Sequence, residues 1–199
     1  YNGVNWSSAA SIATSRRRGA ASGTQNATYI AGSDYPGFAG VTEEYNGLSW
    51  SKSGTLSTGR GYFHGVGGVL GGLVAGGKTP SLVACTELYS GGTFHGTLSA
   101  WSAGGALITA RGQGSGTGIQ NAALVTGGGE PADSNNTEEY DGLTWANGSD
   151  MLAVRFGHGT VGTQDDALLA AGAAGSAVAK DTVEEYNGYV WRAGGSMTI

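Results

Sequence analysis

The sequence predicts an all-β protein built from a four-stranded unit that recurs along the chain. Gly supplies 39 of the 199 residues, charged residues make up only 13%, and five tryptophans recur in similar surroundings. Each Gly in a helix interior costs about 1 kcal/mol relative to Ala, so this composition disfavours helices. The apolar residues stand in short runs bounded by Gly, Asn and Ser, which indicates short strands joined by tight turns.

A Tyr-to-Trp segment marks each copy of the repeat. In the segments YNGVNW, YNGLSW, YDGLTW and YNGYVW the Tyr stands five residues before the Trp. In the remaining segment, YSGGTFHGTLSAW, the spacing is twelve, so this copy carries a seven-residue insertion. The repeated tryptophans are Trp6, Trp50, Trp101, Trp145 and Trp191.

A charged pair recurs with the same regularity. An Arg stands ten residues after each of the first four tryptophans, and a Glu stands two residues before the next Tyr. The arginines are Arg16, Arg60, Arg111 and Arg155, and the glutamates are Glu43, Glu87, Glu138 and Glu184. Residues that recur in every copy serve the repeat, so we expect the two series to be structural partners that form ion pairs inside the fold.

The order of these features predicts four strands per repeat, which is the composition of a β-propeller blade. We expect one domain over residues 1–199, with repeats at about 1–44, 45–88, 89–139 and 140–185 and a partial one at 186–199. This arrangement contains four complete blades and a partial fifth outer hairpin at the N-terminus; five blades are favoured and four come second. The Asn-Gly or Asp-Gly that follows the Tyr in the four segments with the five-residue spacing predicts a two-residue type I′ turn between the third and fourth strands.

The order Arg, apolar run ending in Gly, Glu-x-Tyr-(Asn/Asp) and Trp resembles the kelch repeat over essentially the whole chain. The turn departs from that family's pattern, because kelch repeats typically have Asp-Pro where this chain has Asn-Gly or Asp-Gly. The recurring Glu-Glu-Tyr-Asn-Gly-x-x-Trp segments resemble arrays in kelch-like proteins of bacteriophages and marine bacteria. This resemblance implies a virion or cell-surface setting. A β-solenoid is the rival fold, although solenoid repeats are normally shorter.

Composition and spacing also limit the chemistry. The net charge of −5 argues against a nucleic-acid partner, and no apolar run is long enough to span a bilayer. The single cysteine, Cys85, excludes an internal disulfide and a multi-cysteine metal site. The histidines His64, His95 and His158 have no metal-ligand spacing. We therefore predict no metal, no cofactor and no catalytic residue.

Recognition is expected in the loops, where the repeats differ from one another. Candidate ligand-binding residues are Tyr35 and Phe38 in the loop at 33–40, and Phe94 and His95 in the insertion. The predicted function is a non-catalytic binding or structural module for a glycan or protein surface, in an extracellular or virion setting. The alternative is a hydrolase or lyase that uses the central face of the propeller. The incomplete terminal blade leaves room for strand exchange or oligomerisation.

Overall fold

The structure, a computed structural model, describes residues 1, 3–91, 99–130, 132–175 and 178–198. These ranges contain strands and turns but no helix, so they hold no helix long and apolar enough to cross a membrane. The predicted all-β fold class is therefore confirmed. Two of the candidate residues, Phe94 and His95, lie outside the described residues.

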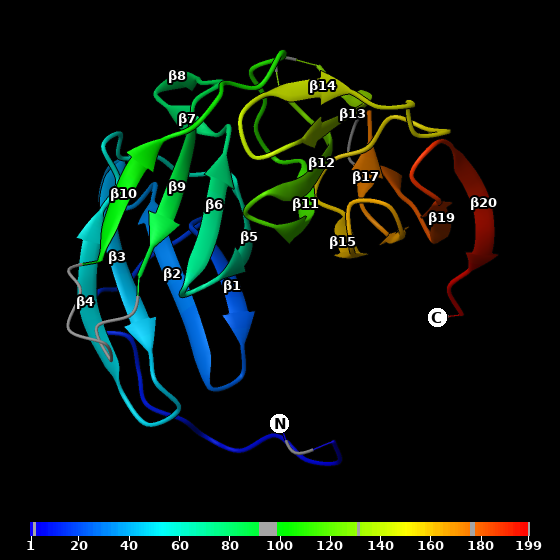
Figure 1. Ribbon diagram of the computed structural model, residues 1–199. Coiled ribbons are helices and arrows are strands. Elements are labelled where there is room, and N and C mark those ends of the chain that lie inside the picture. Colours follow the sequence, from blue (N-terminus) through cyan, green and yellow to red (C-terminus); the bar gives the residue numbers. More distant parts are fainter. Residues whose placement is uncertain (2, 92–98, 131, 176–177, 199) are drawn as a thin grey trace.

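Sixteen of the strands form four antiparallel sheets, or blades, of four strands each (Figure 1). Blade 1 contains β1 (Ala20–Thr24), β2 (Ala27–Ser33), β3 (Ala39–Tyr45) and β4 (Trp50–Thr55). Blade 2 contains β5 (His64–Gly68), β6 (Gly71–Ala75), β9 (Thr86–Ser90) and β10 (Ala100–Ala103). Blade 3 contains β11 (Ser115–Ile119), β12 (Ala122–Gly128), β13 (Ser134–Tyr140) and β14 (Trp145–Asn147). Blade 4 contains β15 (Gly159–Gly162), β16 (Ala167–Ala170), β19 (Thr182–Tyr186) and β20 (Trp191–Ser196).

Two short hairpins extend the loops between the second and third strands of blades 2 and 4. They pair β7 (Lys78–Thr79) with β8 (Ser81–Leu82), and β17 (Ala173–Ala174) with β18 (Val178–Ala179). The corresponding loops of blades 1 and 3 contain no such hairpin among the described residues.

The blades follow one another along an arc, with the first strand of each toward the centre and the fourth on the outside (Figure 1). The inner strands β1, β5, β11 and β15 pack side by side in that order. This is the blade arrangement of a β-propeller. Residues 1 and 3–14, which were expected to begin a partial fifth blade, contain no strand, although the rings of Tyr1 and Trp6 stack with centroids 5.0 Å apart. A lone hairpin is at best marginally stable in water.

The hydrophobic core lies between the blades rather than within one of them. Three clusters of buried residues join blades 1 and 2, blades 2 and 3, and blades 3 and 4. The second strand of each blade supplies fully buried side chains, among them Tyr29, Leu73, Leu124 and Leu169. Alternate residues of a strand point to opposite faces, so a blade covered on both sides buries both sets.

The outer turns of blades 1, 3 and 4 differ from the prediction. The Tyr and Trp that flank it are paired across the strands, as at Tyr45 and Trp50, so four residues rather than two lie between them. Gly47 has a positive φ of 91°, but Asn46 does not. The Asn46 side-chain oxygen instead accepts hydrogen bonds from the amides of Leu48 and Ser49, at 2.9 and 2.8 Å. A type I′ turn needs positive φ at both central residues, so that prediction is wrong; the turn is closed by the Asn side chain.

Candidate functional site

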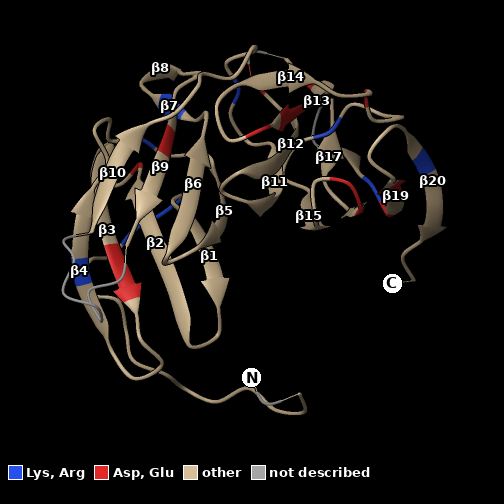
Figure 2. Ribbon diagram, viewed as in Figure 1, with Lys and Arg blue, Asp and Glu red and all other residues tan. Residues whose placement is uncertain are grey.

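The repeated Arg and Glu residues form ion pairs within each blade. All four pairs are buried, and Arg60 with Glu87 has an N to O distance of 3.1 Å. The Arg111 guanidinium also donates to the carbonyl oxygens of Gly127 and Asn136, at 3.1 and 2.9 Å. Figure 2 shows the acidic residues on the third strands β3, β9 and β13. These pairs are enclosed by the blades, so they support the fold and are not available to a ligand.

Four of the repeated tryptophans, Trp50, Trp101, Trp145 and Trp191, begin or lie within the fourth strands, directly opposite the repeated tyrosines. Their rings pack against those tyrosines with centroids 4.5 to 5.1 Å apart and interplanar angles of 30 to 36°. Trp145 and Trp191 are buried, whereas Trp6 is 85% exposed. Trp101, Trp145 and Trp191 serve the packing of successive blades.

The predicted loop residues Tyr35 and Phe38 lie in the exposed connection between β2 and β3. Tyr35 is 59% exposed and Phe38 is 38% exposed. The guanidinium of Arg17 lies 5.5 Å from the centre of the Tyr35 ring. Arg17 is also held by Asp34, with an N to O distance of 3.0 Å. Tyr35 is therefore an accessible aromatic ring beside a fixed cation.

A pocket opens where the beginnings of the four inner strands converge, and we call it the central pocket. Its volume is about 380 Å³. All four blades contribute to its lining, through Arg18, Tyr62, His64, Gln113 and Gly157 and the glycines and Phe63 next to them. This pocket was not identified from the sequence.

Four of the lining residues occupy one repeated position, two residues after each repeated Arg. All four have left-handed backbone: φ is 57° at Arg18, 60° at Tyr62, 62° at Gln113 and 62° at Gly157. Backbone hydrogen bonds link them from blade to blade. The backbone amide of Tyr62 donates to the carbonyl oxygen of Arg18 at 2.8 Å. The amide of Gln113 donates to the carbonyl oxygen of Tyr62 at 3.1 Å, and the amide of Gly157 donates to the carbonyl oxygen of Gln113 at 2.8 Å. The left-handed region is uncommon for residues other than Gly, and such strain is concentrated at functional sites.

The side chains at this position are held by their neighbours. The Arg18 guanidinium lies 4.5 Å from the centre of the Tyr62 ring, and it donates to Asp34 at 2.9 Å. The Gln113 amide donates to Glu130 at 3.2 Å, and the Lys78 ammonium donates to the other oxygen of that carboxylate at 2.9 Å. The pocket therefore presents an aromatic ring together with oriented polar groups.

His64 adds a buried imidazole to the lining of the central pocket. It is 8% exposed, and its Nε2 has no hydrogen-bond partner among the described residues. Burial, with the nearby charge of Arg111, lowers its pKa to about 4. His158 lies close by and is 6% exposed. Burial lowers its pKa to about 3, with further contributions from His64 and Arg155. Both imidazoles are therefore neutral at pH 7.

Metal chemistry gains no support from the described chain. It contains no group of three or more His, Cys, Asp or Glu side chains placed to hold a metal ion.

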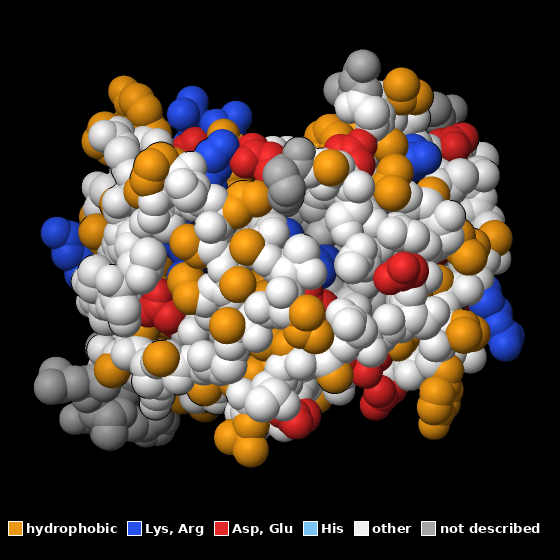
Figure 3. Space-filling view, turned by 90° about the horizontal axis from the view of Figure 1, so that it is seen from above, with side chains coloured by type: hydrophobic (Ala, Val, Ile, Leu, Met, Phe, Trp, Pro, Cys, Tyr) orange, Lys and Arg blue, Asp and Glu red, His pale blue; other side chains and the backbone are white. Residues whose placement is uncertain are grey.

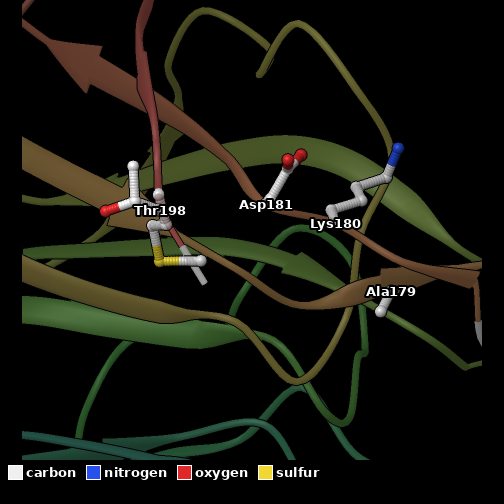
Figure 4. A pocket seen from close by; sticks show the side chains of 5 residues that line it. Ala179, Lys180, Asp181 and Thr198 are labelled. Atoms are coloured by element: carbon white, nitrogen blue, oxygen red, sulfur yellow. The ribbon is translucent and has the colours of Figure 1, made fainter.

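A second pocket of about 500 Å³ lies on blade 4 and is lined by Ala179, Lys180, Asp181, Met197 and Thr198 (Figure 4). It lies between the segment that precedes β19 and the residues that follow β20. Equivalent places in the other blades are closed by the neighbouring blade, so this pocket belongs to an uncovered blade face.

Comparison with known proteins supports the architecture. No protein-family model matches the chain, and no curated protein sequence matches it. Among solved structures, the chain is similar to the one titled "Structure of YjhT", with a TM-score of 0.73 and 13% sequence identity. The superposition covers 94% of this chain and 67% of that chain. At this level of identity the likeness shows the fold, a blade-based β-propeller, and nothing of the ligand.

Proposed function

We propose that the chain is a kelch-like binding module that holds a glycan in the central pocket, with Tyr35 at the side of the site. One observation carries the proposal. The repeat position that surrounds the pocket has the same backbone conformation in every blade, but it carries Arg18, Tyr62, Gln113 and Gly157. Residues that support the repeat recur in each blade, whereas these side chains differ, as expected where a ligand rather than the fold selects them.

The composition of the pocket suits a carbohydrate. A sugar ring has one face that packs on an aromatic ring and a rim of hydroxyl groups that form hydrogen bonds. Tyr62 offers the ring, and Arg18 and Gln113 offer polar groups already fixed by Asp34 and Glu130. The volume of about 380 Å³ lies within the range of small-molecule sites. On the face seen in Figure 3, hydrophobic side chains stand singly or in small groups that are separated by backbone, other side chains and a few charged residues, so this face carries no single broad apolar patch.

Catalysis at the same pocket is the second candidate. A neutral imidazole with a free nitrogen, His64, and a phenol, Tyr62, line one cavity, and both groups can transfer protons in a hydrolase or lyase. The described lining contains no Asp or Glu, so binding without turnover is the proposal that the pocket supports better. Incubation of a bound glycan with the protein, followed by mass analysis, separates the two candidates: an intact glycan supports binding and a cleaved one supports catalysis.

Substitution of the pocket residues by Gly tests the proposal without harm to the fold. A glycan array identifies a ligand for the wild-type chain, and titration calorimetry compares its affinity for Tyr62→Gly. Gly already occupies this position in blade 4 and accepts positive φ, so Tyr62→Gly should keep or raise the free energy of unfolding. We expect its affinity to fall at least about tenfold, which corresponds to about 1.4 kcal/mol.

A matched control is Tyr189→Ala, which removes a tyrosine that is 82% exposed in the outer turn of blade 4. This variant should bind the array ligand as the wild type does. Unchanged affinity in both Tyr62→Gly and Arg18→Gly would place recognition elsewhere on the molecule and overturn the proposal.

A further inference from the structure

The interfaces between successive blades share a set of recurring contacts. The Trp of one blade donates from its indole nitrogen to a Thr of the blade before it. Trp101 reaches Thr42 at 2.9 Å, and Trp145 reaches Thr86 at 3.0 Å. Trp191 reaches Thr137 at 2.9 Å in the same way.

A second recurring contact joins a Tyr to a carboxylate of the preceding blade. The hydroxyl of Tyr89 donates to Glu44, and that of Tyr186 donates to Glu139. Between blades 2 and 3 the acidic residue is replaced by Leu88, which packs against the cluster around Tyr140. The contact therefore links blade 1 to blade 2 and blade 3 to blade 4.

The loop that follows each Trp supplies the third and fourth contacts. Its amides cap the repeated Glu of the next blade, as when Ser57 donates to Glu87 at 2.7 Å and Ile108 donates to Glu138 at 2.6 Å. The residue just before these amides is apolar and buried at the interface. In the first three blades it is Leu56, Leu107 and Met151, each no more than 4% exposed.

Blade 4 carries the same groups on a face that no other blade covers. Met197 stands six residues after Trp191, just as Leu56 stands six residues after Trp50. The backbone amide of Met197 donates to the carbonyl oxygen of Asp181 at 2.8 Å, and the amide of Leu56 donates to the carbonyl oxygen of Gly40 at 2.9 Å in the same way. Yet Met197 is 39% exposed and lines the pocket in Figure 4. Glu185, at the position of Glu44 and Glu139, is exposed as well.

Blade 1 presents the complementary groups on its opposite face. Tyr45 and Trp50 are only half-buried, and the Tyr45 hydroxyl donates to Gly47 in its own turn rather than to a carboxylate. Part of this face is covered by residues 10–14. Trp50 donates to the carbonyl of Ala10 at 3.1 Å, and the amide of Ala13 caps Glu43 at 2.7 Å. Residues 3–9, which precede this segment, are exposed, with Val4 79% and Trp6 85% exposed.

We propose that blade 4 of one copy of this chain docks on blade 1 of a second copy, in the geometry of the internal blade interfaces. Residues 1–14 align with residues 186–199 in the repeat, so residues 195–198 can take the places that residues 10–13 occupy on blade 1. Docking adds two contacts that residues 10–14 do not supply: Glu185 meets Tyr45, and the rest of blade 4 covers the open side of blade 1. Val183 stands where the other blades have the Thr acceptor, so the indole contact of Trp50 is made to a backbone carbonyl alone.

Light scattering coupled to size-exclusion chromatography of the 199-residue chain tests this proposal. The monomer has a mass of 19.9 kDa, and we expect the wild type to shift to at least twice that mass as its concentration rises. Met197→Asp and Glu185→Arg on blade 4, and Tyr45→Asp on blade 1, should each remain monomeric. The first two replace exposed side chains, so their fold should be intact, and circular dichroism checks this. The matched control is Tyr189→Asp, which should associate as the wild type does.

Mixing separates this head-to-tail mode from other kinds of dimer. Met197→Asp retains an intact blade 1 and Tyr45→Asp retains an intact blade 4, so the two monomeric variants should form a dimer when mixed. A wild type that stays monomeric at its highest soluble concentration would overturn the proposal. Association that survives both Met197→Asp and Glu185→Arg would overturn it as well.

Discussion

At the scale of single residues, the stability of each blade depends on one buried cation. Arg111 is 2% exposed, and its guanidinium contacts Glu138 and two carbonyl oxygens. We expect Arg111→Ala to lower the free energy of unfolding by about 3 to 5 kcal/mol, because it leaves the Glu138 carboxylate buried without its counter-charge. Urea denaturation followed by tryptophan fluorescence measures the change.

Arg17 provides the comparison for that substitution. It follows the repeated Arg16 and pairs with Asp34, but its side chain is 57% exposed. Exposed ion pairs contribute about 0 to 1 kcal/mol, so Arg17→Ala should change the free energy of unfolding by no more than that. Equal destabilisation by Arg111→Ala and Arg17→Ala would contradict the structural role of the repeated pair.

The residues of the central pocket show where prediction from the sequence stops. The Arg and Glu series could be recognised because both recur at constant spacing. Tyr62 and Gln113 could not be recognised in this way, because each residue type stands at this repeat position in one copy only. In addition, neither residue type by itself indicates a left-handed backbone. The signal was their position, two residues after each repeated Arg: a repeat position with a different residue in every copy is the pattern expected of a ligand site on a repeated scaffold.

At the scale of strands and turns, the repeat predicted four strands per blade because turn residues and apolar runs alternate regularly. It did not predict how the outer turn closes. Asn and Asp can adopt positive φ themselves or bind the amides that follow them, and the residue type alone does not distinguish these two roles. In this chain the side chain binds the amides in the turns that begin at Asn46, Asp141 and Asn187.

The contact between Tyr and the preceding blade allows a matched test at this scale. The Tyr186 hydroxyl donates to Glu139, whereas the Tyr140 hydroxyl forms no hydrogen bond among the described residues, because Leu88 stands at the position of the acceptor. Hydrogen bonds to charged groups contribute about 1.5 to 3 kcal/mol. Tyr186→Phe should therefore lower the free energy of unfolding by about that amount, and Tyr140→Phe should leave it nearly unchanged.

Thermal and urea unfolding of the two variants give the comparison. Both substitutions remove one oxygen from a buried tyrosine of the same repeat position, so differences in packing largely cancel. An equal cost for the two variants would show that the inter-blade carboxylate does not contribute to stability.

At the scale of the whole molecule, the blades depend on one another, because the core lies between them and the inner strands meet near two buried imidazoles. Blade 2 contributes His64 and blade 4 contributes His158, and they lie close enough for the charge of one to affect the other. The repeat count predicted four complete blades, which are present, but it also favoured a fifth, for which residues 1 and 3–14 supply no strand. The arrangement of the blades along an arc could not be predicted. The number of blades in a ring depends on the angle between neighbouring blades, and the sequence of a single repeat does not encode that angle.

These imidazoles should make the whole molecule sensitive to mild acid. Burial lowers the pKa of His64 to about 4 and that of His158 to about 3, from an unfolded value of about 6.5. The unfolded chain therefore binds more protons than the folded one below about pH 6.5. The contribution of the two neutral histidines to the free energy of unfolding is complete above about pH 6.5, and it is lost as the pH falls toward their pKa values in the folded chain. Each histidine should contribute a slope of up to about 1.4 kcal/mol per pH unit.

Between about pH 6 and pH 5 most carboxylates remain ionised in both states, so the histidines should dominate the slope. Urea unfolding at a series of pH values across this range measures it. The matched variant is His158→Phe, because Phe63 holds the equivalent place in blade 2, where its ring packs close to Gly32 as the His158 ring packs close to Gly127. This variant keeps an aromatic ring at the interface but removes one proton-binding group. We expect it to halve the slope, and a slope that is absent in the wild type or unchanged in His158→Phe would contradict the assignment of acid sensitivity to the buried imidazoles.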